Sequence, residues 1–153
     1  MSHDWTNLKT AQVGRYGEYV MKLELAKLGC DIYVPEIDDH GVDLLFRQQI
    51  GGVFHEVQVK TSTSLDYRYV RKDKFPIRPR FYYGLVLLLD AEPACYLIPL
   101  QAWETPQTPL VSYDYEGKKS APEYGINLGK SDALDLIEHY RLTPTHPSLQ
   151  EAL

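Results

Sequence analysis

Hydrophobic and polar positions along the chain predict a helix near each end and a set of strands between them. Residues 8–28 contain no proline and several good helix formers, and Gly29 follows them as a typical helix end. Two apolar stripes run along this predicted helix, and Glu18 lies within the second. A carboxylate in an apolar stripe is costly unless it is paired or bound, so Glu18 is a candidate functional residue.

Five segments between the helices have the pattern of strands: residues 30–34, 42–47, 53–62, 81–89 and 94–100. Residues 81–89 are almost continuously apolar, which is typical of a central strand buried on both faces. Ser131 is a suitable cap for a final helix over residues 132–141. This order predicts an α/β fold with a mixed sheet of about five strands flanked by helices.

The 153 residues are enough for one domain. We expect a single domain over residues 1–142 and a flexible tail over residues 143–153, where Pro144 and Pro147 occur. Residues 102–124 are rich in proline and tyrosine, and their pattern predicts no defined element.

Composition excludes several classes of protein. Hydrophobic residues make up 44% and charged residues 24%, an ordinary globular balance. The longest apolar run, residues 85–89, has the length of a strand and not of a membrane helix, and the N-terminus lacks the pattern of a secretory signal. Cys30 and Cys95 have no paired spacing. We therefore expect no membrane association, no disulfide framework and a cytoplasmic location.

Charge is distributed unevenly. The formal net charge is -5, yet residues 60–80 contain seven basic and two acidic residues. We predict that this stretch is a long loop that contacts nucleic-acid phosphates, because local charge matters more for such contacts than the global sum. The phosphate-binding candidates are Arg68, Arg71, Lys72, Lys74, Arg78 and Arg80. Tyr67 and Tyr69 lie among them and can stack on bases, although a solvated loop is the simpler alternative.

Candidate chemistry is concentrated in the strand over residues 53–62. Side chains alternate between faces, so Glu56, Gln58 and Lys60 lie in one row. Asp43 is isolated among apolar residues of the preceding strand, and a hairpin can place it beside Gln58. With Glu18 on a helix that covers the sheet, we expect these polar groups to converge at one edge.

The expected cluster suits the hydrolysis of a phosphodiester. Oxygens from Asp43, from the Gln58 amide and from a backbone carbonyl, that of Val59, are ligands for Mg2+, and we expect Mn2+ to substitute. Lys60 can orient the attacking water and stabilise the oxyanion, while Glu18 can hold a metal-bound water or transfer a proton. Each residue alone is more often a turn residue, a solvated strand residue or an exposed helix residue.

Three motifs in order, GRYGE at 14–18, GVDLL at 41–45 and EVQVKT at 56–61, resemble the PD-(D/E)xK nuclease superfamily. That superfamily includes many restriction enzymes, archaeal Holliday-junction resolvases and a group I intron homing endonuclease. The resemblance covers roughly residues 10–100 and implies the restriction-endonuclease-like core. It also implies that Asp43 binds the divalent metal, that Lys60 is the catalytic lysine and that Glu18 matches the helical glutamate of the resolvase-like branches.

The sequence departs from the family pattern at two positions. Val42 replaces the proline before the aspartate, and Gln58 replaces the second acid, as in a subset that includes the homing-endonuclease branch. Loss of one formal charge weakens metal affinity, and Glu56 on the same face is an accessory candidate that can compensate. His40 precedes the metal-site strand and is an accessory candidate for a phosphate contact.

Three functions remain open from the sequence. The first is a Mg2+-dependent DNA endonuclease, active as a homodimer or homotetramer because cutting both strands of a duplex requires two sites. The second is a catalytically inactive nucleic-acid-binding module on the same fold, for which Gln58 is the best argument. The third is a protein-interaction domain, consistent with the net negative charge and the twelve tyrosines.

Overall fold

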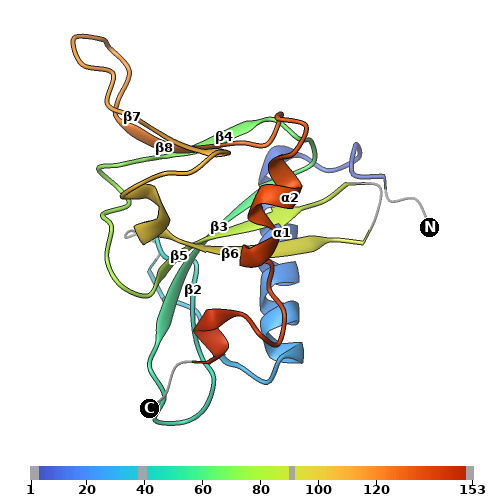
Figure 1. Ribbon diagram of the computed structural model, residues 1–153. Coiled ribbons are helices and arrows are strands. Elements are labelled where there is room, and N and C mark those ends of the chain that lie inside the picture. Colours follow the sequence, from blue (N-terminus) through green and yellow to red (C-terminus); the bar gives the residue numbers. More distant parts are fainter. Residues whose placement is uncertain (1–3, 38–40, 90–91, 151–153) are drawn as a thin grey trace.

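The computed structural model describes residues 4–37, 41–89 and 92–150 (Figure 1). Its elements, in chain order, are α1 (Thr10–Lys27), β1 (Asp31–Tyr33), β2 (Leu44–Arg47), β3 (His55–Ser62), β4 (Tyr67–Arg71), β5 (Phe81–Leu87), β6 (Ala94–Pro99), η1 (Leu100–Trp103), β7 (Leu110–Tyr113), β8 (Glu123–Asn127), α2 (Ala133–Ile137), η2 (Glu138–Tyr140) and η3 (Pro147–Leu149), where η marks a short 3-10 helix.

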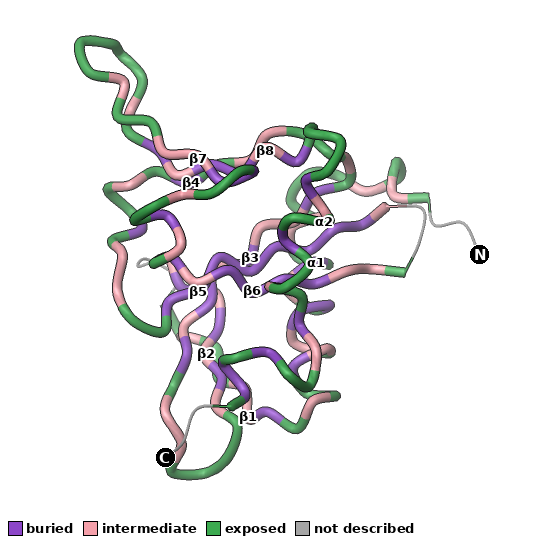
Figure 2. The backbone as a smooth tube through the Cα atoms, viewed as in Figure 1, coloured by how far each residue is buried: buried purple, intermediate pink, exposed green. Residues whose placement is uncertain are grey.

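The main sheet has five strands in the order β1-β2-β3-β5-β6. β3 and β5 are parallel, and the other neighbours are antiparallel, which confirms the mixed sheet predicted from the sequence. Every residue of β5 is buried, as expected for the near-continuous apolar run (Figure 2). In the described part of the chain, no helix has the length and apolar character needed to cross a membrane.

α1 covers one face of the main sheet. The backbone N–H of Lys9 donates to the Gln12 side chain at 2.8 Å at the start of the helix, and Gly29 ends it with a φ of +87°. Gly17 allows the helix to lie close to β3, because a Cβ at this position would be 2.7 Å from the Cβ of Thr61. Val57 and Val59 of β3 belong to the core on this face. Side chains alternate along a strand, so Gln58 and Lys60 lie on the opposite face.

A second layer covers that opposite face. Parallel strands require a crossover connection, and the segment between β3 and β5 contains β4 and the loop over residues 72–80. β4 pairs with β8, and β8 pairs with β7, to give a three-stranded sheet (Figure 1). Val70 and Ile126 from this sheet pack with Phe81 and Leu85 of the main sheet, and Ile137 of α2 joins the same core.

The second sheet was not predicted from the sequence. Residues 67–71, predicted as loop, form β4, and residues 102–124, left without an element, contribute β7 and the start of β8. Only Val70 of β4 is deeply buried, so the strand has almost no apolar signal of its own. The final helix is also shorter than predicted, since α2 ends at Ile137 and η2 follows.

The segment expected to be a flexible tail packs against the main sheet as far as residue 150. His146, Ser148 and Leu149 are buried, and Leu149 is part of the core beneath α1. The His146 ring lies within hydrogen-bonding distance of the Leu97 carbonyl, 2.9 Å from Nε2. The backbone N–H of Ser148 donates to Nδ1 at 3.1 Å. A buried histidine therefore attaches this segment to β6.

Candidate functional site

A cavity of about 770 Å³ lies on the face of β3 that is turned away from α1. β3 contributes its row of polar side chains, the residues before β2 form one rim, and the crossover loop forms the facing wall. The lining residues are Gly41, Val42, Glu56, Gln58, Lys60, Asp73, Lys74, Phe75, Pro76 and Arg78. Residues predicted from the sequence as catalytic and as phosphate-binding are thus brought to one cavity.

Asp43 lies at the point where the β2–β3 ladder ends. Its backbone N–H donates to the Val57 carbonyl at 2.9 Å, and its side-chain Oδ2 accepts from the Val59 N–H at 2.7 Å. The carboxylate therefore takes the place of the next backbone acceptor in the ladder. The β2–β3 register ends with Leu44 opposite Val57, so Asp43 immediately precedes the last residue pair of the ladder.

The Val59 carbonyl points toward this same edge. The Val57 carbonyl accepts from Asp43, so it is directed to the β2 side of β3. Backbone groups alternate in direction along a strand, so the carbonyl of Val59, two residues later, has the same direction. β2 has already ended at this position. The Val59 carbonyl and the Asp43 carboxylate consequently occupy the same gap in the sheet.

Gln58 supplies a third oxygen. Its side-chain Oε1 is buried and has no hydrogen-bond partner among the described residues. A buried acceptor without a partner is costly, and such an atom is a good candidate for a ligand contact. One carboxylate, one amide oxygen and one backbone carbonyl form a donor set for a hard cation such as Mg2+, which keeps several of its water molecules.

The residues present fit such a hard cation and not zinc. Within the described ranges, no group of three or more His, Cys, Asp or Glu side chains is arranged to hold a metal ion. A site for zinc would need such a group of nitrogen, sulfur or carboxylate ligands. The neutral oxygens of Gln58 and Val59 are instead ligands that hard cations accept readily.

Cationic groups surround the cavity. Lys60 lies on the same face as Gln58, and no described residue forms an ion pair or hydrogen bond with its ammonium group. Arg78 donates from Nε to Glu56 Oε2 at 2.8 Å, and its guanidinium lies 3.9 Å from the centre of the Phe81 ring. These two contacts fix the orientation of Arg78. They also engage Glu56, the accessory candidate, in an ion pair.

The structure places other predicted residues away from the cavity. Glu18 pairs with Arg15 on α1 at 3.0 Å and is not a lining residue. Its predicted role in the site stays a prediction. His40 lies outside the described residues.

The basic segment is divided between the cavity and the surface. Lys74 and Arg78 line the cavity, whereas Arg80 is exposed and has a left-handed φ of +58°. Three others form ion pairs: Arg68 with Asp66 at 3.5 Å, Arg71 with Asp73 at 2.7 Å and Lys72 with Asp114 at 2.7 Å. Arg68 also donates to Ser62 Oγ at 2.9 Å.

Sequence reasoning did not identify the walls of the cavity. Asp73, Phe75 and Pro76 come from the crossover loop, and Gly41 and Val42 from the rim before β2. Asp73 was visible only as an acidic residue within the basic segment. The crossover loop brings it to the cavity that Gln58 also lines.

Comparison with known proteins identifies solved structures with a similar fold. No protein-family model matches the sequence, and no curated protein does. Among solved structures, the Holliday junction resolvase Hjc of Archaeoglobus fulgidus, an archaeal hyperthermophile, superposes with a TM-score of 0.51 and 17% identity, over 84% of this chain and 89% of that chain. A bacterial homing endonuclease, I-Ssp6803I, superposes with a TM-score of 0.50 and 17% identity, over 87% of this chain and 86% of that chain.

At this level of identity the likeness concerns the fold. The five-stranded mixed sheet, the helix α1 on one face and the polar row of β3 on the other agree with the motifs found in the sequence. The chain therefore has the restriction-endonuclease-like fold that it shares with these two structures.

Proposed function

We propose that the protein is a divalent-metal-dependent endonuclease that hydrolyses phosphodiester bonds in DNA. The observation that carries the proposal is the buried, partnerless Gln58 Oε1 in a cavity that Lys60 also lines, on the strand whose next residue, Val59, holds the Asp43 carboxylate. Two nucleases, a junction resolvase and a homing endonuclease, share the fold, and this similarity supports the same class of reaction.

The three oxygens would hold Mg2+, with Mn2+ as a substitute. When bound, such an ion lowers the pKa of a coordinated water and offsets the negative charge that develops on the phosphate. The Val59 N–H holds the Asp43 carboxylate in one orientation, so the ligand is positioned before the ion arrives. Preorganisation of this kind reduces the cost of assembling the site.

Lys60 and the crossover loop would act on the substrate. Lys60 follows Gln58 by two residues on the same face, roughly 7 Å along the strand, so its flexible side chain can orient the attacking water or contact the scissile phosphate. Lys74 and Arg78 line the facing wall, and we propose that they bind flanking phosphates. Arg78 uses Nε for Glu56 and keeps its terminal N–H groups for a phosphate.

A second candidate function is a nucleic-acid-binding module that has lost catalysis. The specific observation in its favour is the neutral Gln58 in the second acidic position, with the neighbouring Glu56 already engaged by Arg78. Such a module keeps salt-dependent DNA binding but cleaves no substrate.

A nuclease assay separates the two functions. Supercoiled plasmid, linear duplex, single-stranded DNA and a four-way junction are each incubated with Mg2+, Mn2+ or EDTA. We expect metal-dependent cutting by the wild type and its loss in Lys60→Ala and Asp43→Asn. The matched controls are Lys27→Ala and Asp135→Asn, which change exposed residues on α1 and α2 and should leave cutting intact.

Wild-type protein that binds Mg2+ in calorimetry yet cuts none of these substrates, including a library of randomised duplex sites, would refute the endonuclease proposal and favour the binding module.

We also propose that the active form is a cytoplasmic homodimer or homotetramer, because cutting a duplex on both strands needs two sites. Sedimentation velocity of the wild type measures this directly, and a monomer that cuts both strands would contradict it.

A further inference from the structure

A cluster of tyrosines covers the outer face of the second sheet. Tyr67 and Tyr69 of β4 stack with their ring centroids 6.0 Å apart, and Tyr67 contacts Tyr113 of β7 at 6.5 Å. Tyr113 in turn stacks on Tyr115 at 5.5 Å. These four residues are called the tyrosine face below.

Strand alternation produces this face. Val70 of β4 is buried in the core between the two sheets, so Tyr67 and Tyr69 are directed outward. Gly125 of β8 lies beneath Tyr67, and a Cβ at this position would be 2.5 Å from the ring atom Cε2. The missing side chain lets the ring of Tyr67 lie flat across the sheet.

The rings are held in place from below. The Tyr67 hydroxyl donates to the carboxylate of Glu123, which is buried. Burial and this hydrogen bond raise the pKa of Tyr67, so the phenol stays neutral. The Tyr67 hydroxyl is thus hydrogen-bonded within the protein. The side chains of Tyr69 and Tyr113 remain 55% and 43% exposed. The result is a preformed aromatic surface.

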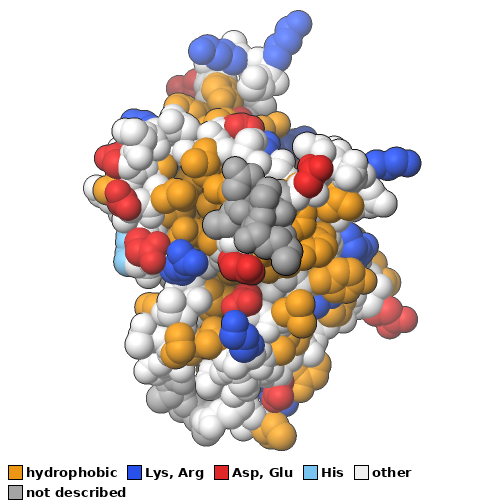
Figure 3. Space-filling view, turned by 90° about the vertical axis from the view of Figure 1, so that its right-hand side faces the viewer, with side chains coloured by type: hydrophobic (Ala, Val, Ile, Leu, Met, Phe, Trp, Pro, Cys, Tyr) orange, Lys and Arg blue, Asp and Glu red, His pale blue; other side chains and the backbone are white. Residues whose placement is uncertain are grey.

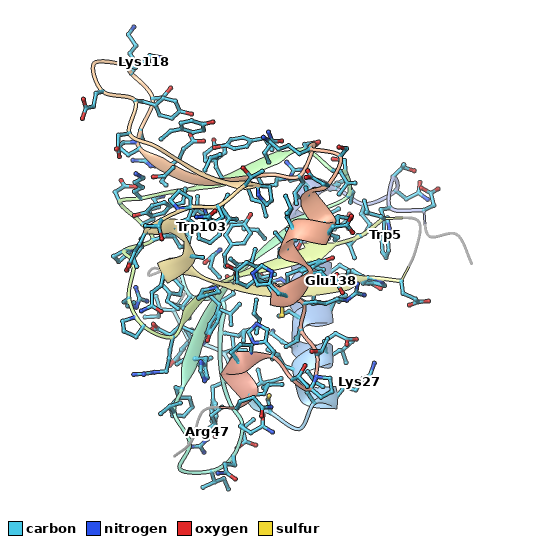
Figure 4. The ribbon with its side chains drawn as sticks, viewed as in Figure 1. Trp5, Lys27, Arg47, Trp103, Lys118 and Glu138 are labelled. Carbon is cyan, nitrogen blue, oxygen red and sulfur yellow. The ribbon has the colours of Figure 1, made fainter. Side chains whose placement is uncertain are left out.

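Basic residues lie at one end of the tyrosine face. The hairpin between β7 and β8 projects from the body and carries the exposed Lys118 and Lys119 at its turn (Figure 4). Figure 3 shows Lys and Arg side chains projecting at this same end of the molecule. Arg71 of β4 lies at this same end of the sheet, since it is opposite Glu123, the first residue of β8 after the hairpin, and it pairs with Asp73, which lines the cavity of the candidate site. This ion pair links the hairpin end of the tyrosine face to the cavity.

We propose that the tyrosine face binds unpaired nucleotides of a single-stranded nucleic-acid segment that continues toward the cavity. Aromatic rings accept the π-face of any base, and each stacked base contributes appreciably to affinity without sequence preference. Lys118, Lys119 and Arg71, all at the hairpin end, can contact the backbone phosphates of the same strand. This inference goes beyond the proposed function, because it requires binding and not cleavage.

The test is a binding titration in EDTA, where cleavage plays no part. A fluorescein-labelled oligothymidylate and a blunt duplex of equal length are titrated by anisotropy. Tyr69→Ser should weaken single-strand binding about tenfold, and Tyr69→Phe should bind like the wild type, because stacking needs the ring and not the hydroxyl. Duplex binding should change little, since its bases are already stacked.

The control is Tyr19→Ser on α1, since Tyr19 is 54% exposed and matches Tyr69 in exposure. Circular dichroism of each variant establishes that it is folded. The proposal is overturned if the wild type does not bind the oligothymidylate, if Tyr69→Ser and Tyr19→Ser bind it equally, or if Tyr69→Phe is as weak as Tyr69→Ser. It is also overturned if Tyr69→Ser changes only the sedimentation coefficient, because the face would then join two copies of the chain.

Discussion

Asp43 has two roles that different substitutions separate. Its carboxylate accepts the Val59 N–H at 2.7 Å where the β2–β3 ladder ends, and it is the charged ligand of the proposed metal site. Alanine removes both functions. Asparagine keeps an acceptor of nearly the same shape and removes the charge.

The expected magnitudes follow from this geometry. A hydrogen bond to a charged group contributes about 1.5–3 kcal/mol, and a partly buried N–H left without an acceptor costs about 1–3 kcal/mol. Asp43→Ala should therefore lower the free energy of unfolding by about 1–3 kcal/mol, and Asp43→Asn by less than about 1 kcal/mol. Both variants should lose at least about tenfold in Mg2+ affinity, since even residues behind the ligands affect affinity by that much.

Two measurements on the same preparations test this reasoning. Urea unfolding in EDTA gives the stability of the apoprotein without any contribution from bound metal. Isothermal titration with Mg2+ gives the affinity of the folded protein. Asp43→Ala with wild-type stability would refute the role of the carboxylate in ending the ladder. Asp43→Asn with wild-type Mg2+ affinity would refute its role as a ligand.

Three further predictions concern the close helix contact, the second ligand and the buried histidine. Gly17→Ala should destabilise the fold by about 1–3 kcal/mol in urea unfolding, because the added Cβ meets Thr61, whereas Gly14→Ala, with nothing within 4 Å, should be neutral or stabilising. Gln58→Glu should tighten Mg2+ binding in calorimetry by restoring a second carboxylate, and unchanged affinity would exclude this side chain from the site. Burial lowers the pKa of His146, so the unfolded state takes up a proton first as pH falls below about 6.5, and stability should drop by at most about 1.4 kcal/mol per pH unit. His146→Gln should flatten this dependence between pH 7 and 5, and the exposed-site control His139→Gln should not.

The sequence predicted the parts of the fold that carry a local signal. The limits of α1 agree with the helix predicted over residues 8–28, because helix formers and Gly29 are local features. The polar row of β3 came from strand alternation, and the hydrogen bond from the Val59 N–H to Asp43 puts the isolated Asp43 next to this strand. Short-range patterns of this kind depend on the period of the element and not on distant contacts.

The second sheet and the C-terminal segment could not be predicted, because their structure depends on distant contacts and not on a local signal. β4 has one deeply buried residue, and its stability depends on pairing with β8, which lies more than fifty residues away. His146 and Leu149 occur in a segment whose prolines, Pro144 and Pro147, are typical of a loose tail, yet both residues are buried against the main sheet. Tertiary contacts decide the structure of such segments, so local propensity carries little information about them.

Placement of the candidate site follows from one topological constraint. Gly17 allows α1 to occupy the Val57 and Val59 face of β3, so the crossover from β3 to the parallel β5 has only the other face available. That face carries Gln58 and Lys60, and the crossover brings Lys74 and Arg78 over them. The basic residues of the crossover loop therefore meet the polar row of β3 because the chain has to cross this face to reach the parallel strand β5. Glu18, on the helix that occupies the first face, is separated from the cavity by the same constraint.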